Sequence, residues 1–238
     1  MRSEPAGPGV HAAAAAALAL VGDGAVVGLG TGRAASAFIA MLGDRVRRGL
    51  AVSGVATSDS AARQAVEEGI ALVDLTEELE LDLTVDGADE VAPNLDLVKG
   101  WGGALVRERI VASASRRQII IVGDEKLVQR LGERGRLPVE VIPLARGPVL
   151  RRLDALALAP AVRRAADGAG AFLTENGNLL IDCALAEPIA DGVAARALDR
   201  AIRAIAGVVD TGLFLGTAER VLVGFASGRV DTLTRGQA

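Results

Sequence analysis

The sequence predicts an α/β fold, a Rossmann-like parallel-sheet domain with a second, smaller α+β domain. Short apolar runs of strand length alternate with segments of helical periodicity in the first half of the chain, and this alternation is typical of a parallel sheet with helices on both faces. After Gly132 the order becomes strand, helix, hairpin, helix and strand, which predicts a split βαβ (ferredoxin-like) unit. The chain has 238 residues, of which 50% are hydrophobic, enough for one large domain or two small ones.

The chain order also predicts the domain boundaries. We expect residues 1–132 and 215–238 to form the Rossmann-like domain, and residues 133–214 to form the ferredoxin-like domain. Two final strand-like runs, Val221–Phe225 and Arg229–Thr234, predict a hairpin that returns to the first domain.

The elements of the first domain follow from periodicity and capping signals. The run His11–Val21 resembles a signal-peptide core, but it is too short to span a membrane and Glu4 precedes it, so it predicts a first helix. The expected strands are Ala25–Leu29, Val52–Ala56, Ala71–Asp74, Leu81–Val85 and Gln118–Val122. The expected helices run from Gly32 to about Met41, over Ser58–Glu68, which opens with a Ser/Asp cap, and over Ala104–Ala114.

The second domain is predicted in the same way. Its hairpin is indicated by Glu175-Asn176-Gly177, a turn sequence between two apolar runs. The expected strands are Pro138–Ile142, Phe172–Thr174, Asn178–Cys183 and Gly207–Phe214, and the expected helices are Pro148–Leu156 and Ile189–Ile205.

Composition excludes several classes of partner. Aromatic residues make up 2% of the chain, tyrosine is absent and the net charge is −4 without a basic block, so we expect no nucleic-acid partner. We also expect no membrane partner. Cys183 is the single cysteine, which precludes an intramolecular disulfide and favours a cytoplasmic location.

No metal and no cofactor are expected. His11 is the single histidine, so we expect neither a histidine-based metal site nor a catalytic triad. The acids from Asp86 to Asp96 match no calcium loop, and Lys99 would compete with a cation there.

The segment from Val85 to Arg109 carries the chemistry. Asp86 and Asp89 follow a strand, where open α/β sheets place ligands. Lys99 and a glycine-rich loop come next, and they offer a positive charge and backbone N–H groups. Glu108 lies at the start of a predicted helix, whose dipole keeps a carboxylate ionised. This set of groups predicts proton transfer on a small anionic substrate.

A second glycine-rich turn, Gly28–Arg33, connects a strand to a helix, a position that favours anion binding. Arg33 occupies the third glycine place of the dinucleotide fingerprint, and no acid ends the next strand. An anion-binding turn is therefore favoured over a nucleotide site, although a plain tight turn stays possible.

At these residues the chain resembles type A ribose-5-phosphate isomerase over nearly its whole length. The resemblance rests on several blocks in the same order: Gly28–Gly32, Val85–Glu90, Lys99–Ala112, Leu137–Pro143, Thr174–Asn178 and Gly207–Phe214. It implies interconversion of ribose 5-phosphate and ribulose 5-phosphate in the pentose phosphate pathway, without a metal, by a homodimer or homotetramer.

The resemblance also implies residue roles. Glu108 would be the base that moves a proton between C2 and C1 through a cis-enediol(ate). Asp86, Asp89 and Lys99 would bind sugar hydroxyls, assist ring opening and stabilise the oxyanion. The substrate-binding residues it implies are Thr31, Gly32, Arg33, Ala34, Gly87, Ala88, Gly100, Trp101, Gly102 and Lys126.

Two loops depart from the family pattern. Family members read Thr-Gly-Ser-Thr where this chain has Thr31–Ala34, and Lys-Gly-Gly-Gly where it has Lys99–Gly102. Trp101 would be strained if its position requires a positive φ. Alternatives are therefore an isomerase of a different sugar phosphate or a catalytically silent phosphosugar-binding protein. A nicotinamide oxidoreductase is disfavoured by the missing fingerprint.

Overall fold

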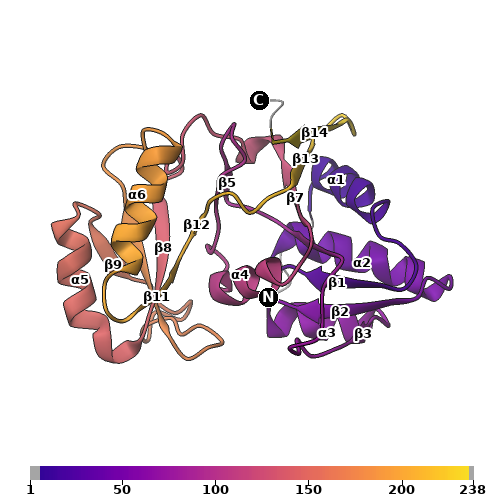
Figure 1. The fold of residues 1–238 in the computed structure, drawn as a ribbon, viewed down its shortest axis with the longest axis horizontal. Coiled ribbons are helices and arrows are strands. Elements are labelled where there is room, and N and C mark those ends of the chain that lie inside the picture. Colours follow the sequence, from indigo (N-terminus) through magenta and orange to yellow (C-terminus); the bar gives the residue numbers. More distant parts are fainter. Residues whose placement is uncertain (1–5, 236–238) are drawn as a thin grey trace. The chain divides into compact units, whose positions relative to one another are not determined.

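The computed structural model describes residues 6–235, which fall by their contacts into two compact units (Figure 1). The first unit comprises residues 6–88, 107–127 and 217–235, and the second comprises residues 89–106 and 128–216. The sequence analysis assigned residues 89–106, 128–132 and 215–216 to the first domain, whereas their contacts group them with the second unit. The physical reason is a small sheet, described below, that pairs part of the 89–106 segment with residues far along the chain.

The first unit contains a seven-stranded sheet. Its order is β14-β13-β7-β4-β1-β2-β3, and every neighbouring pair is parallel except β13 and β14. The predicted parallel sheet and the return of the C-terminal hairpin are thus confirmed. The strands are β1 (Ala25–Leu29), β2 (Val52–Ala56), β3 (Ala71–Leu72), β4 (Leu83–Asp86), β7 (Gln118–Gly123), β13 (Arg220–Gly224) and β14 (Val230–Thr234).

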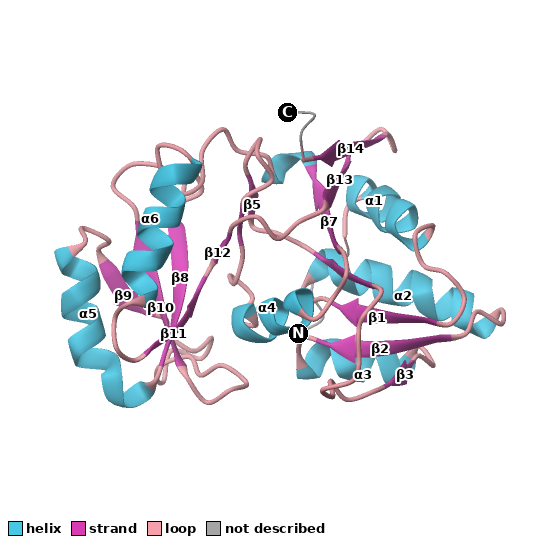
Figure 2. Cartoon of the chain, in the orientation of Figure 1, coloured by secondary structure: helices cyan, strands magenta, loops and turns pink. Residues whose placement is uncertain are grey.

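The helices, drawn in cyan in Figure 2, lie close to the segments that the sequence predicts. The first helix begins at Pro8, a residue suited to the first helical position because it lacks an N–H that would need a partner. Ser58 caps α3, its Oγ accepting the N–H of Ala61 at 3.1 Å. The helical segments of the first unit are α1 (Pro8–Leu18), α2 (Arg33–Arg47), α3 (Asp59–Glu67) and η1 (Asp124–Lys126), together with α4 (Leu105–Ser113), whose first two residues are grouped with the second unit. No helix among residues 6–235 is long and apolar enough to cross a membrane.

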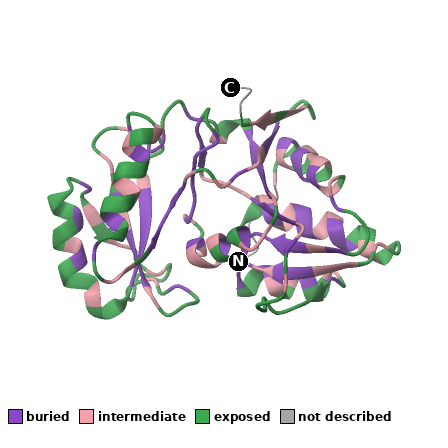
Figure 3. Cartoon of the chain, viewed as in Figure 1, coloured by how far each residue is buried: buried purple, intermediate pink, exposed green. Residues whose placement is uncertain are grey.

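Both faces of the parallel sheet are covered, and β7 is buried along its whole length (Figure 3). Side chains alternate between the two faces of a strand. Val27 therefore joins the main core, with Phe38 of α2, while its neighbour Val26 joins a smaller cluster with Val111 of α4. Helices consequently lie on opposite faces of this sheet, as the sequence predicts.

The second unit contains a four-stranded antiparallel sheet in the order β11-β8-β10-β9. The chain order β8-α5-β9-β10-α6-β11 is the predicted split βαβ arrangement. Its elements are β8 (Arg136–Val141), η2 (Pro143–Ala145), α5 (Arg146–Ala155), β9 (Pro160–Val162), β10 (Leu179–Ala184), α6 (Gly192–Arg203) and β11 (Val208–Thr211).

The predicted strand Phe172–Thr174 is wrong. Residues 160–162 form the edge strand β9 instead, and Leu173 makes only an isolated bridge to Leu179. The chain turns at residues 174–178, so the segment before the turn pairs with the segment after it at one position, Leu173 with Leu179. The sequence does not predict β9 because proline is disfavoured within strands. An edge strand nevertheless accepts Pro160, since one row of its N–H groups needs no partner in the sheet.

The predicted strand Gly207–Phe214 divides at Gly212. Its first part is β11, and its last two residues form β12 (Leu213–Phe214) in a separate sheet ordered β12-β6-β5, with β6 (Leu97–Val98) and β5 (Glu90–Val91). A Cβ at Gly212 would lie 2.4 Å from the carbonyl oxygen of Lys99 and 2.9 Å from Cδ of Pro138. Glycine is required because two other backbone segments meet the chain at this point.

A similar close approach joins α1 to β13. A Cβ on Gly224 would lie 1.7 Å from the carbonyl oxygen of Gly9, and a Cβ on Gly9 would lie 2.6 Å from the oxygen of Gly224. The two backbones therefore pack without any side chain between them.

We expect Gly224→Ala to lower the free energy of unfolding by about 1–3 kcal/mol, because the new methyl group can be accommodated only if the backbone moves. Denaturant unfolding measures the change. Gly22→Ala is the matched control, since no atom of the described residues, its chain neighbours aside, lies within 4 Å of a Cβ at Gly22. Equal stability of the two variants would contradict the close packing.

Candidate active site

Four adjacent strands of the first unit end at one edge of the sheet. β7, β4, β1 and β2 are neighbours and parallel, so the residues that end or follow them share that edge. They are Lys126 beyond β7, Asp86 at the end of β4, Thr31 beyond β1 and Thr57 beyond β2. The chain order reverses between β1 and β4, the position at which open α/β sheets bind ligands.

Asp86 organises the loop that follows β1. Its side chain is fully buried, and Oδ1 accepts the backbone N–H groups of Thr31 at 3.1 Å and of Gly87 at 2.8 Å. A Cβ at Gly30 would lie 2.3 Å from the same oxygen, so only glycine allows this approach. Gly87 and the next residue, Ala88, are half-buried at the end of the unit's first segment.

The loop leads directly into α2. Gly32 is the N-cap with φ of +96°, a conformation that favours glycine. Arg33 and Ala34 form the first turn, in which backbone N–H groups have no partner within the helix. Arg33 is exposed. N–H groups of this kind, a helix dipole and a guanidinium are the features that favour anion binding.

Two hydroxyl residues at this edge were missed by the sequence analysis. Oγ1 of Thr31 lies 2.7 Å from Oγ1 of Thr57 and donates to Oγ of Ser58 at 2.8 Å. The available signal was position, because residues 57 and 58 directly follow the strand that neighbours β1 in a parallel sheet.

Glu108 lies in the first turn of α4 and is 5% exposed. The positive end of a helix dipole favours the ionised carboxylate there. The neighbouring side chain of Arg107 donates to Asp59 at 2.9 Å. The helix dipole offsets part of the free-energy cost of burying the Glu108 carboxylate.

Asp89 and Lys99 belong to the second unit, where the small sheet fixes their backbones. The N–H of Asp89 donates to the oxygen of Val98 at 2.8 Å, and the N–H of Lys99 donates to that of Gly212 at 2.9 Å. Lys99 is 2% exposed, with Nζ 5.6 Å from the centre of the Phe214 ring. Aromatic faces attract such a cation.

The glycine-rich loop accommodates Trp101 without backbone strain. Positive φ angles occur at Gly100, +101°, and Gly103, +92°, whereas Trp101 is outside the left-handed region. The N–H of Trp101 donates to Oδ2 of Asp89 at 2.9 Å, and Nε1 donates to the oxygen of Arg136 at 3.1 Å. The guanidinium of Arg136 also lies 4.9 Å from the centre of the indole. The structure thus brings Asp89 and Trp101 together. A Cβ at Gly102 would meet no atom of residues 6–235 within 4 Å apart from its chain neighbours.

Two further ionisable side chains are structural. Burial raises the pKa of Glu90, and its carboxylate accepts the N–H groups of Gly132 at 2.5 Å and Arg134 at 2.7 Å. Burial, followed by the charge of Asp182, raises the pKa of Cys183 to about 12, so the thiol stays protonated at neutral pH. Among residues 6–235, no cluster of three histidine, cysteine or acidic side chains could hold a metal ion.

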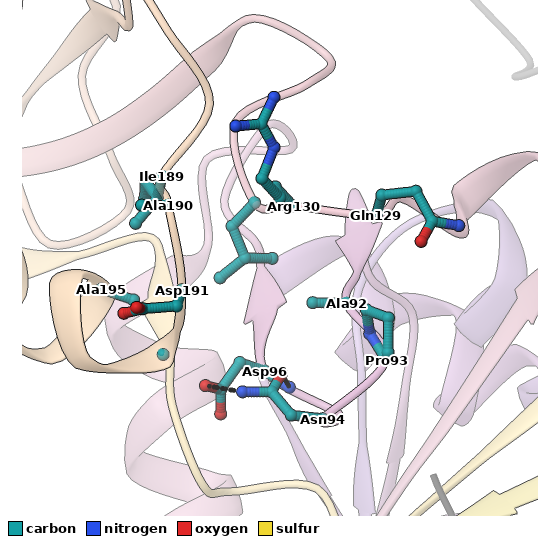
Figure 4. Close-up of a pocket in the computed structure, with 12 residues that line it drawn as sticks. Ala92, Pro93, Asn94, Asp96, Gln129, Arg130, Ile189, Ala190, Asp191 and Ala195 are labelled. Atoms are coloured by element: carbon teal, nitrogen blue, oxygen red, sulfur yellow. Dashed lines mark hydrogen bonds between the residues drawn. The ribbon is translucent and has the colours of Figure 1, made fainter.

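A cavity of about 250 Å³ in the second unit contains none of the predicted site residues (Figure 4). Pro93, Asn94, Asp96, Leu131 and Asp191 are among the residues that line it. Its acids are already engaged, because Asp96 accepts from Asn94 at 2.7 Å and Asp191 caps α6. The cavity therefore adds no reactive group to the site.

Comparison with known proteins links this geometry to one family. A model of the family "ribose 5-phosphate isomerase A (phosphoriboisomerase A)" matches residues 53–228. Ribose-5-phosphate isomerase A of Gloeobacter violaceus is 48% identical over 223 residues, covering 93% of this chain and 94% of that protein. The protein of that name in Deinococcus radiodurans is 45% identical over 228 residues, covering 94% and 96%.

Solved structures show the same similarity. Ribose 5-phosphate isomerase A of Methanocaldococcus jannaschii has a TM-score of 0.88 and 40% identity, covering 94% of this chain and 97% of that chain. A D-ribose-5-phosphate isomerase in complex with phospho-erythronic acid has a TM-score of 0.89 and 36% identity, covering 95% and 97%. The similarity therefore extends over both units.

The glycine-rich loop can be tested at two adjacent positions. A Cβ at Gly103 would lie 2.6 Å from Cζ of Phe172, and its φ is positive, so we expect Gly103→Ala to lower the free energy of unfolding by roughly 1–3 kcal/mol. Gly102→Ala meets open space and should change it by less than about 0.5 kcal/mol. Denaturant unfolding compares the two, and the reverse order would refute this loop conformation.

Proposed function

The chain belongs to the ribose 5-phosphate isomerase A family, and from this premise we propose that it interconverts D-ribose 5-phosphate and D-ribulose 5-phosphate, with Glu108 as the base. The family resemblance inferred from the sequence is confirmed by the matches over both units. The observation that carries the assignment of the base is the buried carboxylate in the first turn of α4.

One carboxylate can perform both proton transfers. In the open-chain aldose, Glu108 removes the proton from C2, the C–H electron pair forms the C1–C2 double bond, and the carbonyl oxygen at C1 becomes an enediolate oxygen. After a proton has moved between the two oxygens, the carboxylic acid returns its proton to C1 and the carbonyl forms at C2. A positioned base of this kind contributes about 10²–10⁴-fold to the rate.

Asp86, Asp89 and Lys99 are proposed to act on the sugar. Asp86 and Asp89 are three residues apart, so their Cα atoms are at most about 11 Å apart. Both carboxylates can accept sugar hydroxyl protons and assist ring opening. Lys99 supplies a buried positive charge, which stabilises the developing enediolate more strongly than an exposed charge would.

The phosphate is proposed to bind at the start of α2. Thr31, Gly32, Arg33 and Ala34 supply N–H groups, one hydroxyl and a guanidinium, and Lys126 supplies a second charge from the end of β7. Family members carry two further hydroxyls in this loop, where the present chain has Arg33 and Ala34. The hydroxyls of Thr57 and Ser58, which hydrogen-bond with Thr31, are proposed to take their place. The phospho-erythronic acid bound by one structural relative is also a phosphate ester.

The remaining substrate-binding residues are proposed to contact the sugar through backbone groups. They are Gly87, Ala88, Gly100, Trp101 and Gly102. We further propose a cytoplasmic homodimer or homotetramer. The buried lone thiol supports a reducing compartment, and exposed apolar side chains at Leu72, Val73 and Ile110 support self-association.

We expect Glu108→Gln to lower kcat about 10²–10⁴-fold, because an amide cannot accept the C2 proton. Ketose formation from ribose 5-phosphate by purified, chelator-treated protein measures this change. Glu67→Gln, at an exposed position of α3, is the control and should retain the wild-type rate. A Glu108→Gln variant that retains the wild-type kcat would remove Glu108 from the role of base.

Arg33→Ala should raise KM for ribose 5-phosphate about tenfold or more, because a hydrogen bond to a charged group contributes roughly 1.5–3 kcal/mol. With unphosphorylated D-ribose, which has no phosphate for Arg33 to bind, the variant and the wild type should have the same kcat/KM. Arg45→Ala in the last turn of the same helix is the control. An unchanged KM for ribose 5-phosphate would show that Arg33 does not bind the phosphate.

A further inference from the structure

We propose that Arg163 is a positioning residue for the isomerase reaction, holding the Gly100–Trp101 loop and, through it, the carboxylate of Asp89. The inference rests on the proposed function. It depends on contacts within the second unit only, where Arg163 directly follows β9.

The guanidinium of Arg163 binds two different partners with its two edges. Nε donates to Oδ2 of Asp182 at 2.9 Å, and Nη2 donates to Oδ1 at 2.5 Å. Nη1 donates to the carbonyl oxygens of Gly100 at 3.2 Å and Trp101 at 3.0 Å. The Arg163 side chain is 11% exposed and that of Asp182 is 17% exposed, so water competes weakly for these bonds.

These two carbonyl bonds fix the direction of the loop peptides. In a planar trans peptide the C=O and the following N–H point in opposite directions. When the oxygen of Gly100 points to Arg163, the N–H of Trp101 points away from it, and that N–H donates to Oδ2 of Asp89 at 2.9 Å. The peptide group between Gly100 and Trp101, directly after Lys99, thus links Arg163 to Asp89, whose carboxylate is proposed to bind substrate.

The surroundings of Arg163 reinforce this arrangement. Its guanidinium lies 5.8 Å from the centre of the Phe172 ring, and the same ring lies against Gly103 at the other end of the loop. Nη1 of Arg136 lies 3.5 Å from Asp182, while its guanidinium contacts the indole of Trp101. A simple structural ion pair would require only Asp182, whereas Arg163 also binds two carbonyl groups of the loop.

Lysine cannot replace these contacts. The planar guanidinium presents donors along two edges, whereas an ammonium is a point charge. Arg163→Lys therefore retains a charge opposite Asp182 but loses the simultaneous bonds to the carboxylate and to both carbonyls. Comparison of the two residues separates charge from geometry.

The chain contains a reporter for the loop. Trp101 is the single tryptophan and tyrosine is absent. Intrinsic fluorescence that is excited at roughly 295 nm therefore comes from Trp101. Acrylamide quenching of this emission measures how well the loop is held. The measurement requires neither substrate nor turnover.

The experiment compares Arg163→Met and Arg163→Lys with two controls in the full-length protein. Arg164→Met changes the exposed next residue, whose Nη1 donates to the oxygen of Gly168 at 3.4 Å. Arg203→Met removes a comparable ion pair with Asp210 in the same unit. Each variant is measured for kcat, KM, thermal unfolding and quenching.

We expect Arg163→Met to lower kcat about 10–10²-fold, because a displacement of about 1 Å can cost 10²-fold. KM should change less, and Trp101 quenching should rise. Arg163→Lys should share both defects, and it serves as the test if Arg163→Met does not fold. Both controls should keep the wild-type kcat and quenching.

The proposal is overturned if Arg163→Met and Arg163→Lys keep kcat within about twofold of wild type, or if Arg203→Met loses kcat equally at the same loss of thermal stability. Unchanged quenching would also overturn it. If the wild-type protein does not turn over ribose 5-phosphate, the proposed function fails, and quenching then decides separately whether Arg163 holds the loop.

Discussion

The burial of Asp86 beside Gly30 is the constraint on which the first unit's part of the site depends. A charged carboxylate can be buried only if donors surround it, and here the N–H groups of Thr31 and Gly87 satisfy one oxygen. The same bonds fix the loop after β1, and this loop starts α2. One buried side chain therefore connects the ends of β4 and β1 and sets the position of the proposed phosphate-binding turn.

Backbone junctions have the corresponding role in the second unit. Gly212 allows the chain to leave the four-stranded sheet and pair with β6, because no side chain separates it from Lys99 and Pro138. This pairing holds Asp89 and Lys99 by main-chain hydrogen bonds. These two proposed site residues thus project from hydrogen-bonded backbone, although a glycine-rich loop directly follows Lys99.

The charged groups follow one physical rule. Glu108 has a helix N-terminus, Glu90 has two backbone N–H groups, and Asp182 has the guanidinium of Arg163. Each arrangement lowers the cost of burying a charge. The departure at Trp101 is accommodated because the loop positions with positive φ are Gly100 and Gly103 and not position 101.

The sequence by itself determined the parallel sheet and the β-α-β-β-α-β order, and it suggested the residues from Asp86 to Glu108 as a candidate site, because periodicity, turn chemistry and local motifs are properties of neighbouring residues. The strand at 160–162, the division at Gly212 and the two-residue strands β5, β6 and β12 were decided by tertiary structure. Their partners are remote in the chain, and two-residue strands carry no periodicity. Thr57 and Arg163 were missed for the same reason, since their importance lies in contacts with loops 26 and about 60 residues away.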